Sequence, residues 1–478
     1  MPARKFSLIQ IFAFILFVAL FLACADKKAT APIDDSAPAG ITDLIAGNAT
    51  DSTITLQWTS PGDDADSGMA YGYDLRYSIY PITESNWNTA SKVLGLPLPS
   101  LAGYLEEVTI DGLAPATRYF FAIKANDEIP HWSVLSNIAT DRTTGTSATH
   151  WEELGNGLDG PAESMTLFQN SLVVGGIFME AGEIRANHIA AWDDSSWSGL
   201  GQGMGGMEGS VTALAVYNGQ IILPGRTGGH GGGISLFAWN GENWITIGSG
   251  FNDIVRALAV YDGRLIAAGD FNSKGPQSLN HIAAWDGSNW EPLGDGINGG
   301  VENLFVYGNL LIVGGTFDMA GGTTANRIAS WDGSNWSALG SGISGGMRPE
   351  VSVMTEYNGK LIAGGLFDSA GDMAVSNIAS WDGNSWTALG DGTNTAISGL
   401  AVYDNLLIAG GDFTSAGGYP VSRIASWDGA NWGPLDDGLD GDVNCLQVYN
   451  GRLIAAGNFG NAGDISVHRI AAWSRTSN

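Results

Sequence analysis

The stretch WEPLGDGINGGVENLFVYGNLLIVGGTFDMAGGTTANRIASWDGSNW, from Trp290 to Trp336, is one copy of a unit that repeats along the chain. The copies open at Trp151, Trp197, Trp244, Trp290, Trp336, Trp386 and Trp432, with spacings of 46, 47, 46, 46, 50 and 46 residues. A second set of tryptophans keeps the same register, at Trp192, Trp239, Trp285, Trp331, Trp381, Trp427 and Trp473. Each unit holds four short β-type segments joined by Gly- and Asn-rich turns. A period in the forties made of four short strands predicts the blades of a β-propeller.

The two ends of the repeat region complement each other. The region opens at Trp151 with a fourth (d) strand that lacks its blade, and it finishes at Trp473 with a third (c) strand that lacks its fourth. Pairing these fragments completes seven blades and closes the ring, which removes exposed sheet edges. We therefore predict an all-β protein in which residues 151–478 form a seven-bladed β-propeller closed by the N-terminal d strand.

The chain begins with a segment that has the features of an export signal. Arg4 and Lys5 precede an apolar run at 11–23, which is too short to span a bilayer, and Cys24 follows it. The junction Leu22-Ala23-Cys24 resembles a bacterial lipoprotein signal, which implies a diacylated Cys24. Ala25 follows the cysteine, and by resemblance to Gram-negative sorting rules this implies the outer membrane or the cell surface. The alternative is ordinary secretion with cleavage nearby.

The charge of the chain restricts its partners. The net charge is −28, and loss of Arg4 and Lys5 with residues 1–23 would take it from −28 to −30. Such a surface repels nucleic acid and anionic lipid, so we expect no nucleic-acid partner and membrane contact through the lipid anchor alone. Cys445 is the second of two cysteines, so an acylated Cys24 would leave no disulfide. We expect Cys445 to be a buried small hydrophobe rather than a reactive thiol.

A separate domain precedes the repeats. Alternating segments run through 53–58 and 72–78, and the motif Leu113-Ala114-Pro115-Ala116-Thr117-Arg118-Tyr119 leads into a third segment. Residues 38–144 resemble a fibronectin type III domain, with Trp58 as the core tryptophan and Tyr119 as the tyrosine corner. The predicted organisation is therefore a lipoprotein signal peptide at 1–23, a flexible tether at 24–37, this domain as a spacer at 38–144, a linker at 145–150 and the propeller at 151–478.

Two groups of acidic residues are weak candidates for calcium. Asp63, Asp64 and Asp66 lie within one loop of the first domain, although the loop lacks the acidic twelfth position of an EF-hand. Gly-Asp-Gly and related turns of the repeats place Asp295, Asp391 and Asp437 in equivalent loops. We expect solvated turns in preference to metal sites, and no cofactor; any bound calcium would be structural.

The repeats themselves resemble known families. Their G-G-x-F-x-x-A-G-G and I-A-x-W-D-G motifs resemble kelch-like propellers and, more closely, the repeats of fungal cortical cell-pole marker proteins and related bacterial surface proteins. Such propellers usually present a binding surface, which implies an interaction protein. We expect the fourteen repeat tryptophans to pack between blades rather than stack on carbohydrate.

Sequence variation places the binding surface on one face of the propeller. The a–b and c–d turns are nearly invariant, whereas the d–a and b–c connections vary, as at 345–350 and 224–233. The residue before each third segment also varies, and the ligand-binding candidates at this position are His188, His281, Arg327, Asn377, Arg423 and Arg469, with Ser235 in the second copy. These residues either form a basic ring for an anionic or hydroxyl-rich ligand, or pair with loop carboxylates such as Asp270, Asp318, Asp368 and Asp412.

Two functions follow from this reading. The first is a lipid-anchored cell-surface protein whose propeller face binds an extracellular protein or glycan, with the fibronectin-like domain as spacer. The second is a glycan-active hydrolase or lyase on a propeller scaffold. Paired carboxylates near one arginine at the centre would favour the enzyme, and a bare, wide channel would favour binding. The residues form no recognisable catalytic motif, so we expect the protein not to be an enzyme.

Overall fold

The computed structural model describes residues 36–475, except 65, 66, 116, 130, 145–148, 205–209 and 227–232. The expected signal peptide, Cys24 and residues 24–35 of the expected tether lie outside the described residues. Apart from one short 3-10 helix, η1 (Trp87–Thr89), the regular structure of the described chain is all strand, which confirms the all-β prediction. Within these residues, no helix has the length and apolar character that crossing a membrane requires.

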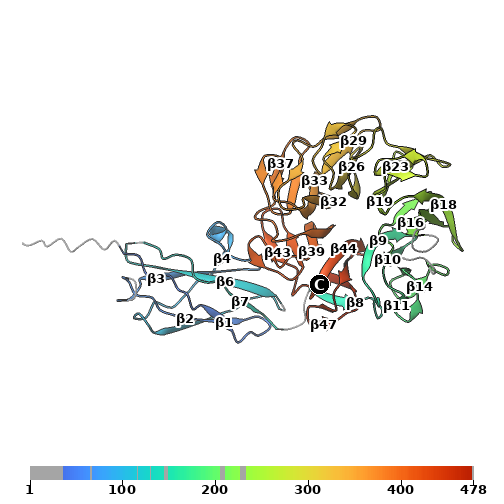
Figure 1. Ribbon diagram of the computed structural model, residues 1–478. Coiled ribbons are helices and arrows are strands. Elements are labelled where there is room, and N and C mark those ends of the chain that lie inside the picture. Colours follow the sequence, from blue (N-terminus) through green and yellow to red (C-terminus); the bar gives the residue numbers. More distant parts are fainter. Residues whose placement is uncertain are drawn as a thin grey trace, which may run out of the picture.

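The first domain consists of two antiparallel sheets (Figure 1). Trp58 is fully buried in the core between them. The hydroxyl of Tyr119 accepts a hydrogen bond of 2.9 Å from the Ala114 amide, so the predicted tyrosine corner is present. One sheet has the order β1 (Ile45–Gly47), β2 (Ile54–Thr59), β5 (Leu105–Ile110); the other has the order β4 (Ser91–Lys92), β3 (Gly72–Ser78), β6 (Arg118–Asn126), β7 (Ala139–Arg142).

Seven antiparallel sheets follow, each with four main strands whose order in the sheet is their order in the chain, apart from the last position of the seventh. Sheets one to four contain β9 (Ala162–Phe168), β10 (Ser171–Gly176), β13 (Ile189–Trp192) and β14 (Trp197–Gly199); β15 (Ala215–Tyr217), β16 (Gln220–Arg226), β17 (Ile234–Trp239) and β18 (Trp244–Phe251); β19 (Val255–Tyr261), β20 (Arg264–Gly269), β23 (Ile282–Trp285) and β24 (Trp290–Pro292); β25 (Val301–Tyr307), β26 (Leu310–Gly315), β29 (Ile328–Trp331) and β30 (Trp336–Ala338). Sheets five to seven contain β32 (Glu350–Tyr357), β33 (Lys360–Leu366), β36 (Ile378–Trp381) and β37 (Trp386–Ala388); β38 (Ile397–Tyr403), β39 (Leu406–Gly411), β42 (Ile424–Trp427) and β43 (Trp432–Pro434); β44 (Asp442–Tyr449), β45 (Arg452–Asn458), β48 (Ile470–Arg475) and β8 (Thr149–Glu153).

In six of the seven sheets, the connection between the second and third strands forms a small hairpin that the sequence did not predict. The isolated bridge between Leu158 and Ala181 pairs one such hairpin with the chain that enters the sheet. Residues 227–232 of the variable connection expected at 224–233 lie outside the described residues. The short strands of these hairpins are β11 (Glu180–Ala181), β12 (Ile184–Arg185), β21 (Ser273–Lys274), β22 (Gln277–Ser278), β27 (Met319–Ala320), β28 (Thr323–Thr324), β34 (Ser369–Ala370), β35 (Met373–Ala374), β40 (Ser415–Ala416), β41 (Tyr419–Pro420), β46 (Asn461–Ala462) and β47 (Ile465–Ser466). A further short strand, β31 (Ile343–Ser344), lies in the connection between the fourth and fifth sheets and pairs with β34.

The ends of the repeat region come together in the seventh sheet. Strand β8 pairs with β48, and Trp151 lies opposite Trp473 in the register. The innermost strands of neighbouring sheets contact one another in turn, and β44 of the last sheet contacts β9 of the first. Figure 1 shows the sheets arranged around a common centre. We call this part of the molecule the ring.

Tyrosine hydroxyls connect neighbouring sheets of the ring. Tyr307, at the end of β25, donates a hydrogen bond of 2.7 Å to the Gly359 carbonyl in the first turn of the next sheet. Tyr449 makes the same bond, at 2.9 Å, to Asn170, which joins the seventh sheet to the first. The tyrosine at this position of the repeat therefore supports both packing and the order of the sheets.

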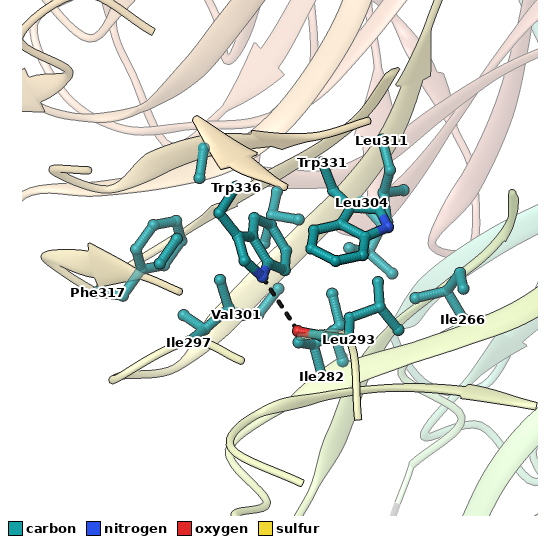
Figure 2. Close-up of a cluster of buried hydrophobic side chains, with 14 of the residues drawn as sticks. Ile266, Ile282, Leu293, Ile297, Val301, Leu304, Leu311, Phe317, Trp331 and Trp336 are labelled. Carbon is teal, nitrogen blue, oxygen red and sulfur yellow. Dashed lines mark hydrogen bonds between the residues drawn. The ribbon is translucent and has the colours of Figure 1, made fainter. Parts of the chain in front are cut away.

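The repeat tryptophans pack between sheets, as the sequence predicts. Trp331 and Trp336 lie opposite each other with ring centroids 5.0 Å apart. Figure 2 shows them in a core with Leu293 from the preceding connection, whose carbonyl accepts a hydrogen bond of 3.1 Å from the Trp336 indole. The indole has a polar edge as well as a large apolar surface, so it both fills the core and satisfies a buried carbonyl.

The aspartate in the motif Trp-Asp-Gly has a local structural role. One carboxylate oxygen of Asp332 accepts hydrogen bonds from the amides of Ser334 and Asn335, at 2.8 and 2.7 Å. These bonds close an Asx-type turn between the third and fourth strands. At the equivalent position, hydrogen bonds from Ser195 and Ser196 lower the pKa of Asp193 to about 2. The motif thus stabilises a hairpin.

Ion pairs join the first domain to the sixth sheet of the ring. Arg142 donates hydrogen bonds of 2.6 Å to Asp437 and 2.7 Å to Asp436, and Arg118 also pairs with Asp437. Gly433 is needed at this joint, because a β-carbon there would lie 2.4 Å from the ring of Tyr80. The first domain is therefore docked on the ring through these side chains.

We expect Arg142→Ala to loosen this joint. Loss of two charge-assisted hydrogen bonds should reduce the coupling between the domains by about 1–2 kcal/mol, because the pair is only partly exposed. Small-angle scattering should then show a wider distribution of distances than in the wild type. Arg264→Ala, which removes an exposed pair with Glu291 elsewhere on the ring, is the control. An unchanged scattering curve for Arg142→Ala would contradict the docked arrangement.

Candidate binding site

A cavity of about 570 Å³ lies at the centre of the ring. Its walls come from corresponding positions at the start of the innermost segment of every sheet. These positions form an outer polar layer, a middle layer of mostly small residues and an inner apolar layer. The inner layer consists of Met165, Leu214, Leu258, Leu304, Leu400 and Leu446. The cavity is therefore polar at one end and apolar at the other.

The outer layer is polar in all seven sheets. It consists of Glu163, Thr212, Arg256, Glu302, Ser352, Ser398 and Asn444. In six of these sheets this residue is the extra residue of a β-bulge, as the register shift between Val301 and Asn303 shows for Glu302. A bulge redirects one side chain out of the alternating pattern and is common beside functional sites. The repeated bulges thus place six polar side chains, with Thr212 as the seventh, around one opening.

Some of these side chains also connect the sheets. Asn444 donates a hydrogen bond of 2.9 Å to the Ala162 carbonyl of the first sheet. Thr212 donates an equivalent bond of 2.9 Å to the Val255 carbonyl of the third sheet. The outer layer is therefore held in place from sheet to sheet, which is how a preorganised site is built.

Arg256 is the cation of the outer layer. Its guanidinium donates two hydrogen bonds, of 2.9 and 2.6 Å, to one carboxylate oxygen of Asp270. The Glu302 carboxylate of the next sheet lies 3.6 Å from the same guanidinium. One arginine thus lies between two carboxylates at the centre of the ring. Two carboxylates beside one arginine at the centre are the arrangement expected for the enzyme alternative.

The Glu302 carboxyl is perturbed by its surroundings. Partial burial raises its pKa above the usual value of 4.5, and the charges of Glu350 and Asp270 act in the same direction. The Arg256 guanidinium opposes the shift. A carboxyl with a raised pKa in a cavity is a candidate proton donor or ligand contact.

The raised pKa of Glu302 predicts a pH dependence. Because the folded protein binds this proton more tightly, the carboxyl stabilises the fold below pH 4.5 and loses that contribution as the pH rises through the raised pKa. Stability relative to Glu302→Gln should therefore fall across that window. Carbon-13 titration of labelled glutamates, with Glu302→Gln for assignment, measures the value directly. Arg256→Gln should raise it further, and a pKa at or below 4.5 in the wild type would contradict the prediction.

The six ligand-binding candidates predicted from the sequence occupy one equivalent backbone position. His188, His281, Arg327, Asn377, Arg423 and Arg469 all have positive φ, between 62° and 76°, directly before the third strand. The structure places Ser235 inside β17 instead. The backbone at this position is held on both sides: the Arg327 amide donates to the Phe317 carbonyl, and the Arg327 carbonyl accepts from the Gly315 amide.

The side chains of these candidates mostly contact backbone groups. Arg327 donates hydrogen bonds of 3.2 Å to the Pro349 and Phe317 carbonyls. Asn377 is buried and donates a bond of 2.7 Å to the Thr393 carbonyl. The pairs with loop carboxylates differ from those expected. Asp270 pairs with Arg256 of the outer layer. Arg423 contacts the backbone carbonyl of Asp412, and its guanidinium lies 3.4 Å from the Asp442 carboxylate. The geometric reason is that Arg327 and Arg423 reach toward the first strand of the next sheet.

The calcium candidates are not gathered into a metal site in the described chain. The amides of Asp63 and Asp64 donate to the Ser67 carbonyl in a tight turn, and Asp66 lies outside the described residues. Among the described residues, no group of three or more His, Cys, Asp or Glu side chains is placed to hold a metal ion. Asp437, another candidate, pairs with Arg118 and Arg142 at the joint.

Cys445 lies in the middle layer of the cavity wall. Its side chain is half-buried, and removal from water, together with the Glu163 charge, raises the pKa of the thiol to about 12. Because the thiolate is the reactive species, the raised pKa disfavours reaction of this cysteine at neutral pH. The sequence predicted a buried small hydrophobe; the side chain packs against a core cluster but is only half-buried, because it lines the cavity.

The polar outer layer of the cavity was not predicted from the sequence. A signal for it exists, because each innermost segment begins with an apolar residue followed by a polar one, with an apolar residue at the fourth position, as in Val255-Arg256-Ala257-Leu258. The polar second position occurs in all seven copies. In a strand with a regular period of two, the sequence does not show whether this position faces the centre of the ring. The bulge is what places it there.

Comparisons with known proteins concern limited parts of the chain. Residues 42–140 match the family of purple acid phosphatase N-terminal domains. Calcium-activated chloride channel regulator 1 is similar over part of the chain: the horse protein is 38% identical over 122 residues and the human protein 37% over 122 residues. Each match covers 24% of this chain but only 13% of the relative. The chain therefore corresponds to about an eighth of these relatives' length.

Solved structures add a likeness in fold. The fibronectin type III domain of human fibronectin type III domain containing protein 3 is 21% identical, with 23% of this chain and 90% of that chain covered and a TM-score of 0.16. A sensor domain of an anti-sigma factor from Pseudobacteroides cellulosolvens is 18% identical, with 24% and 99% covered and a TM-score of 0.15. Fibronectin type III-like folds are therefore among the solved structures similar to this chain.

Proposed function

We propose that this protein is a lipid-anchored binding protein of the bacterial cell envelope, at the outer membrane or the cell surface. The Leu22-Ala23-Cys24 junction supports a lipoprotein anchor at Cys24, and Ala25 supports outer-membrane sorting. The fibronectin-like domain holds the ring at the end of this anchor. The ring is, in this proposal, a kelch-like seven-bladed β-propeller closed by β8, with repeats similar to those of fungal cortical cell-pole marker proteins.

The ligand in this proposal is an extracellular protein or a glycan, bound at the outer layer of the cavity. The observation that carries the proposal is the ring of polar side chains that the β-bulges turn toward one opening. Arg256, Glu302 and Ser398 together offer donors and acceptors to a hydroxyl-rich or charged group. His188, His281, Arg327, Asn377, Arg423 and Arg469 are further contact candidates at the ends of the third strands.

The charge of the chain limits the partners that this protein can have. The net charge of −28 disfavours nucleic acid as a partner and favours membrane contact through the lipid anchor alone. We propose no cofactor, with calcium considered only as a structural ion.

The alternative function is a glycan-active hydrolase or lyase. One observation favours it: Arg256 lies between the carboxylates of Asp270 and Glu302, and the pKa of Glu302 is raised. General acid catalysis on sugars commonly uses a carboxyl with a raised pKa together with a second carboxyl group. Binding remains the main proposal, because the inner layer of the cavity offers only apolar side chains.

A paired screen separates the two functions. The full-length protein is tested for binding to a glycan array and to envelope proteins, with and without calcium, and for turnover of a polysaccharide panel. A specific ligand that is bound and recovered intact supports binding. Turnover that disappears in Glu302→Gln supports the enzyme. If the protein shows no binding and no turnover, both functions proposed for the cavity are contradicted.

A further inference from the structure

The exposed apolar side chains of this protein are concentrated in its first domain. Of the 23 large apolar side chains that are exposed among the described residues, 12 lie between residues 45 and 134. The ring is about three times longer and carries the other 11. Single exposed apolar residues are normal on protein surfaces, whereas a cluster marks an interaction site. The distribution therefore directs attention to the first domain.

Six of these side chains come from loops at one end of the domain. The loops are joined by hydrogen bonds: Ala102 donates to the Gly68 carbonyl at 3.0 Å, Gly103 to the Ser60 carbonyl at 2.9 Å, and Tyr71 to the Asn126 carbonyl at 2.7 Å. The exposed fractions are 45–70%. We call this surface the apolar pole; it consists of Met69, Tyr71, Leu101, Tyr104, Trp132 and Val134.

The apolar pole lies at the end of the domain away from the ring. Strand β6 begins at Arg118, which pairs with Asp437 of the ring, and it ends at Asn126, which accepts the Tyr71 hydrogen bond. A strand of this kind runs the length of the sandwich. Figure 1 shows the ring at one end of the first domain only. The joint and the apolar pole are therefore at opposite ends.

The chain also enters the domain near the apolar pole. A β-carbon on Gly40 would lie 2.5 Å from the Val134 side chain, and the Asn137 amide donates to the Ile41 carbonyl at 3.3 Å. Residues 1–35 thus precede this end of the domain. The 14 residues from Cys24 to Ala37 span about 50 Å when fully extended and about 20 Å as a flexible coil. An anchor at Cys24 would hold the apolar pole within that distance of the bilayer.

We propose that the apolar pole docks on the membrane surface, with a lipid bilayer as its occupant. This inference rests on the lipid anchor of the proposed function. Aromatic and aliphatic side chains on loop tips suit the interface between head groups and acyl chains. The anchor raises the local concentration of lipid at the pole, so that weak contacts suffice. The first domain would then contact the membrane directly, in addition to the anchor expected from the sequence, and would fix the height of the ring above the bilayer rather than act as a free spacer.

Charge at the pole specifies the lipid. Asp63, Asp64 and Glu128 lie on the same loops and carry negative charge at or near the surface. Anionic head groups would repel them, so the pole should prefer zwitterionic lipid. Increasing the fraction of phosphatidylglycerol in a phosphatidylethanolamine bilayer should therefore weaken docking, and salt should reduce this effect.

Depth-dependent fluorescence quenching tests the proposal on the full-length lipidated protein in vesicles. The label is bimane on Tyr71→Cys in a Cys445→Ala background, and spin-labelled acyl chains quench it. The control label is on Ser334→Cys, in an exposed hairpin of the ring. Co-flotation with the vesicles first establishes whether the protein is anchored. Anchored protein with quenching at residue 71 and none at residue 334 is the expected result.

Variants complete the test. Met69→Ser together with Leu101→Ser and Tyr104→Ser should reduce quenching at residue 71 about tenfold while the protein still floats, because these side chains are exposed and their loss leaves the core intact. Met347→Ser, on a side chain that is 99% exposed in the ring, should change nothing. Flotation without quenching at residue 71 would overturn the docking proposal alone, and shielding of the label without lipid would indicate a second copy as the occupant. Failure to float would overturn the anchor and docking with it.

Discussion

Replacing Trp151 by alanine should lower the free energy of unfolding by about 3–5 kcal/mol, the usual cost of removing a buried tryptophan. The side chain is 6% exposed and comes from β8, the strand that completes the seventh sheet. It packs in one core with Ile408 and Val443 from the sixth and seventh sheets. Its loss therefore affects the sheet in which the two ends of the repeat region meet. Urea unfolding followed by far-ultraviolet circular dichroism measures the change.

Two control variants separate the contribution of β8 from the general loss of an aromatic side chain. Trp132→Ala removes a tryptophan that is 45% exposed in the first domain, and it should cost less than about 1 kcal/mol. Trp336→Ala, in an interior sheet, should cost about as much as Trp151→Ala because the burial is similar. If Trp151→Ala were as mild as Trp132→Ala, β8 would not be part of the folded ring.

Ser398→Trp should abolish ligand binding while leaving the fold intact. Ser398 is exposed and lines the outer layer of the central cavity, so a tryptophan there extends into open space rather than into the core. Filling the opening should weaken binding by about 100-fold or more, equivalent to about 3 kcal/mol. The measurement is the affinity for the ligand that the screen identifies, by isothermal titration calorimetry.

The matched control introduces the same side chain on the other side of the ring. Ser334→Trp lies in an exposed turn between third and fourth strands and should leave affinity unchanged. Equal unfolding free energies for the two variants would show that any difference in affinity reflects the cavity. Unchanged affinity in Ser398→Trp would place the binding site elsewhere, with the six residues before the third strands as the next candidates.

Much of the fold is readable from the sequence because the repeat copies report the same structure independently. Tryptophans such as Trp331 and Trp336 recur in register, and turn residues such as Asp332 recur with them, so each copy reinforces the same strand assignment. The pairing of β8 with β48 was also predictable, since each end lacked what the other supplied. In the first domain, the position of Tyr119 in its motif predicted a tyrosine corner, and its hydroxyl accepts a hydrogen bond from the Ala114 amide.

The candidate site was harder to predict because it depends on deviations from regular structure. A β-bulge at Glu302 or Arg256 changes which face a residue occupies, and a strand pattern with a period of two does not indicate where the extra residue lies. The ion pairs between Arg142 and Asp437 join residues 295 positions apart, so no local pattern indicates them. The small hairpins between second and third strands were missed because strands of two residues carry too little periodicity.

The most direct test of the binding site compares two arginines of the third sheet. Arg256 lies in the outer layer of the cavity between Asp270 and Glu302, whereas Arg264 pairs with Glu291 on an exposed surface outside the cavity lining. The dissociation constant of the identified ligand is measured for Arg256→Gln and Arg264→Gln, with unfolding curves to establish that both are folded. We predict that Arg256→Gln weakens binding at least about thirtyfold, because losing one partner of a desolvated charged contact costs about 2 kcal/mol or more, and that Arg264→Gln has no effect. Equal dissociation constants for the two folded variants would contradict the assignment of the central cavity as the binding site.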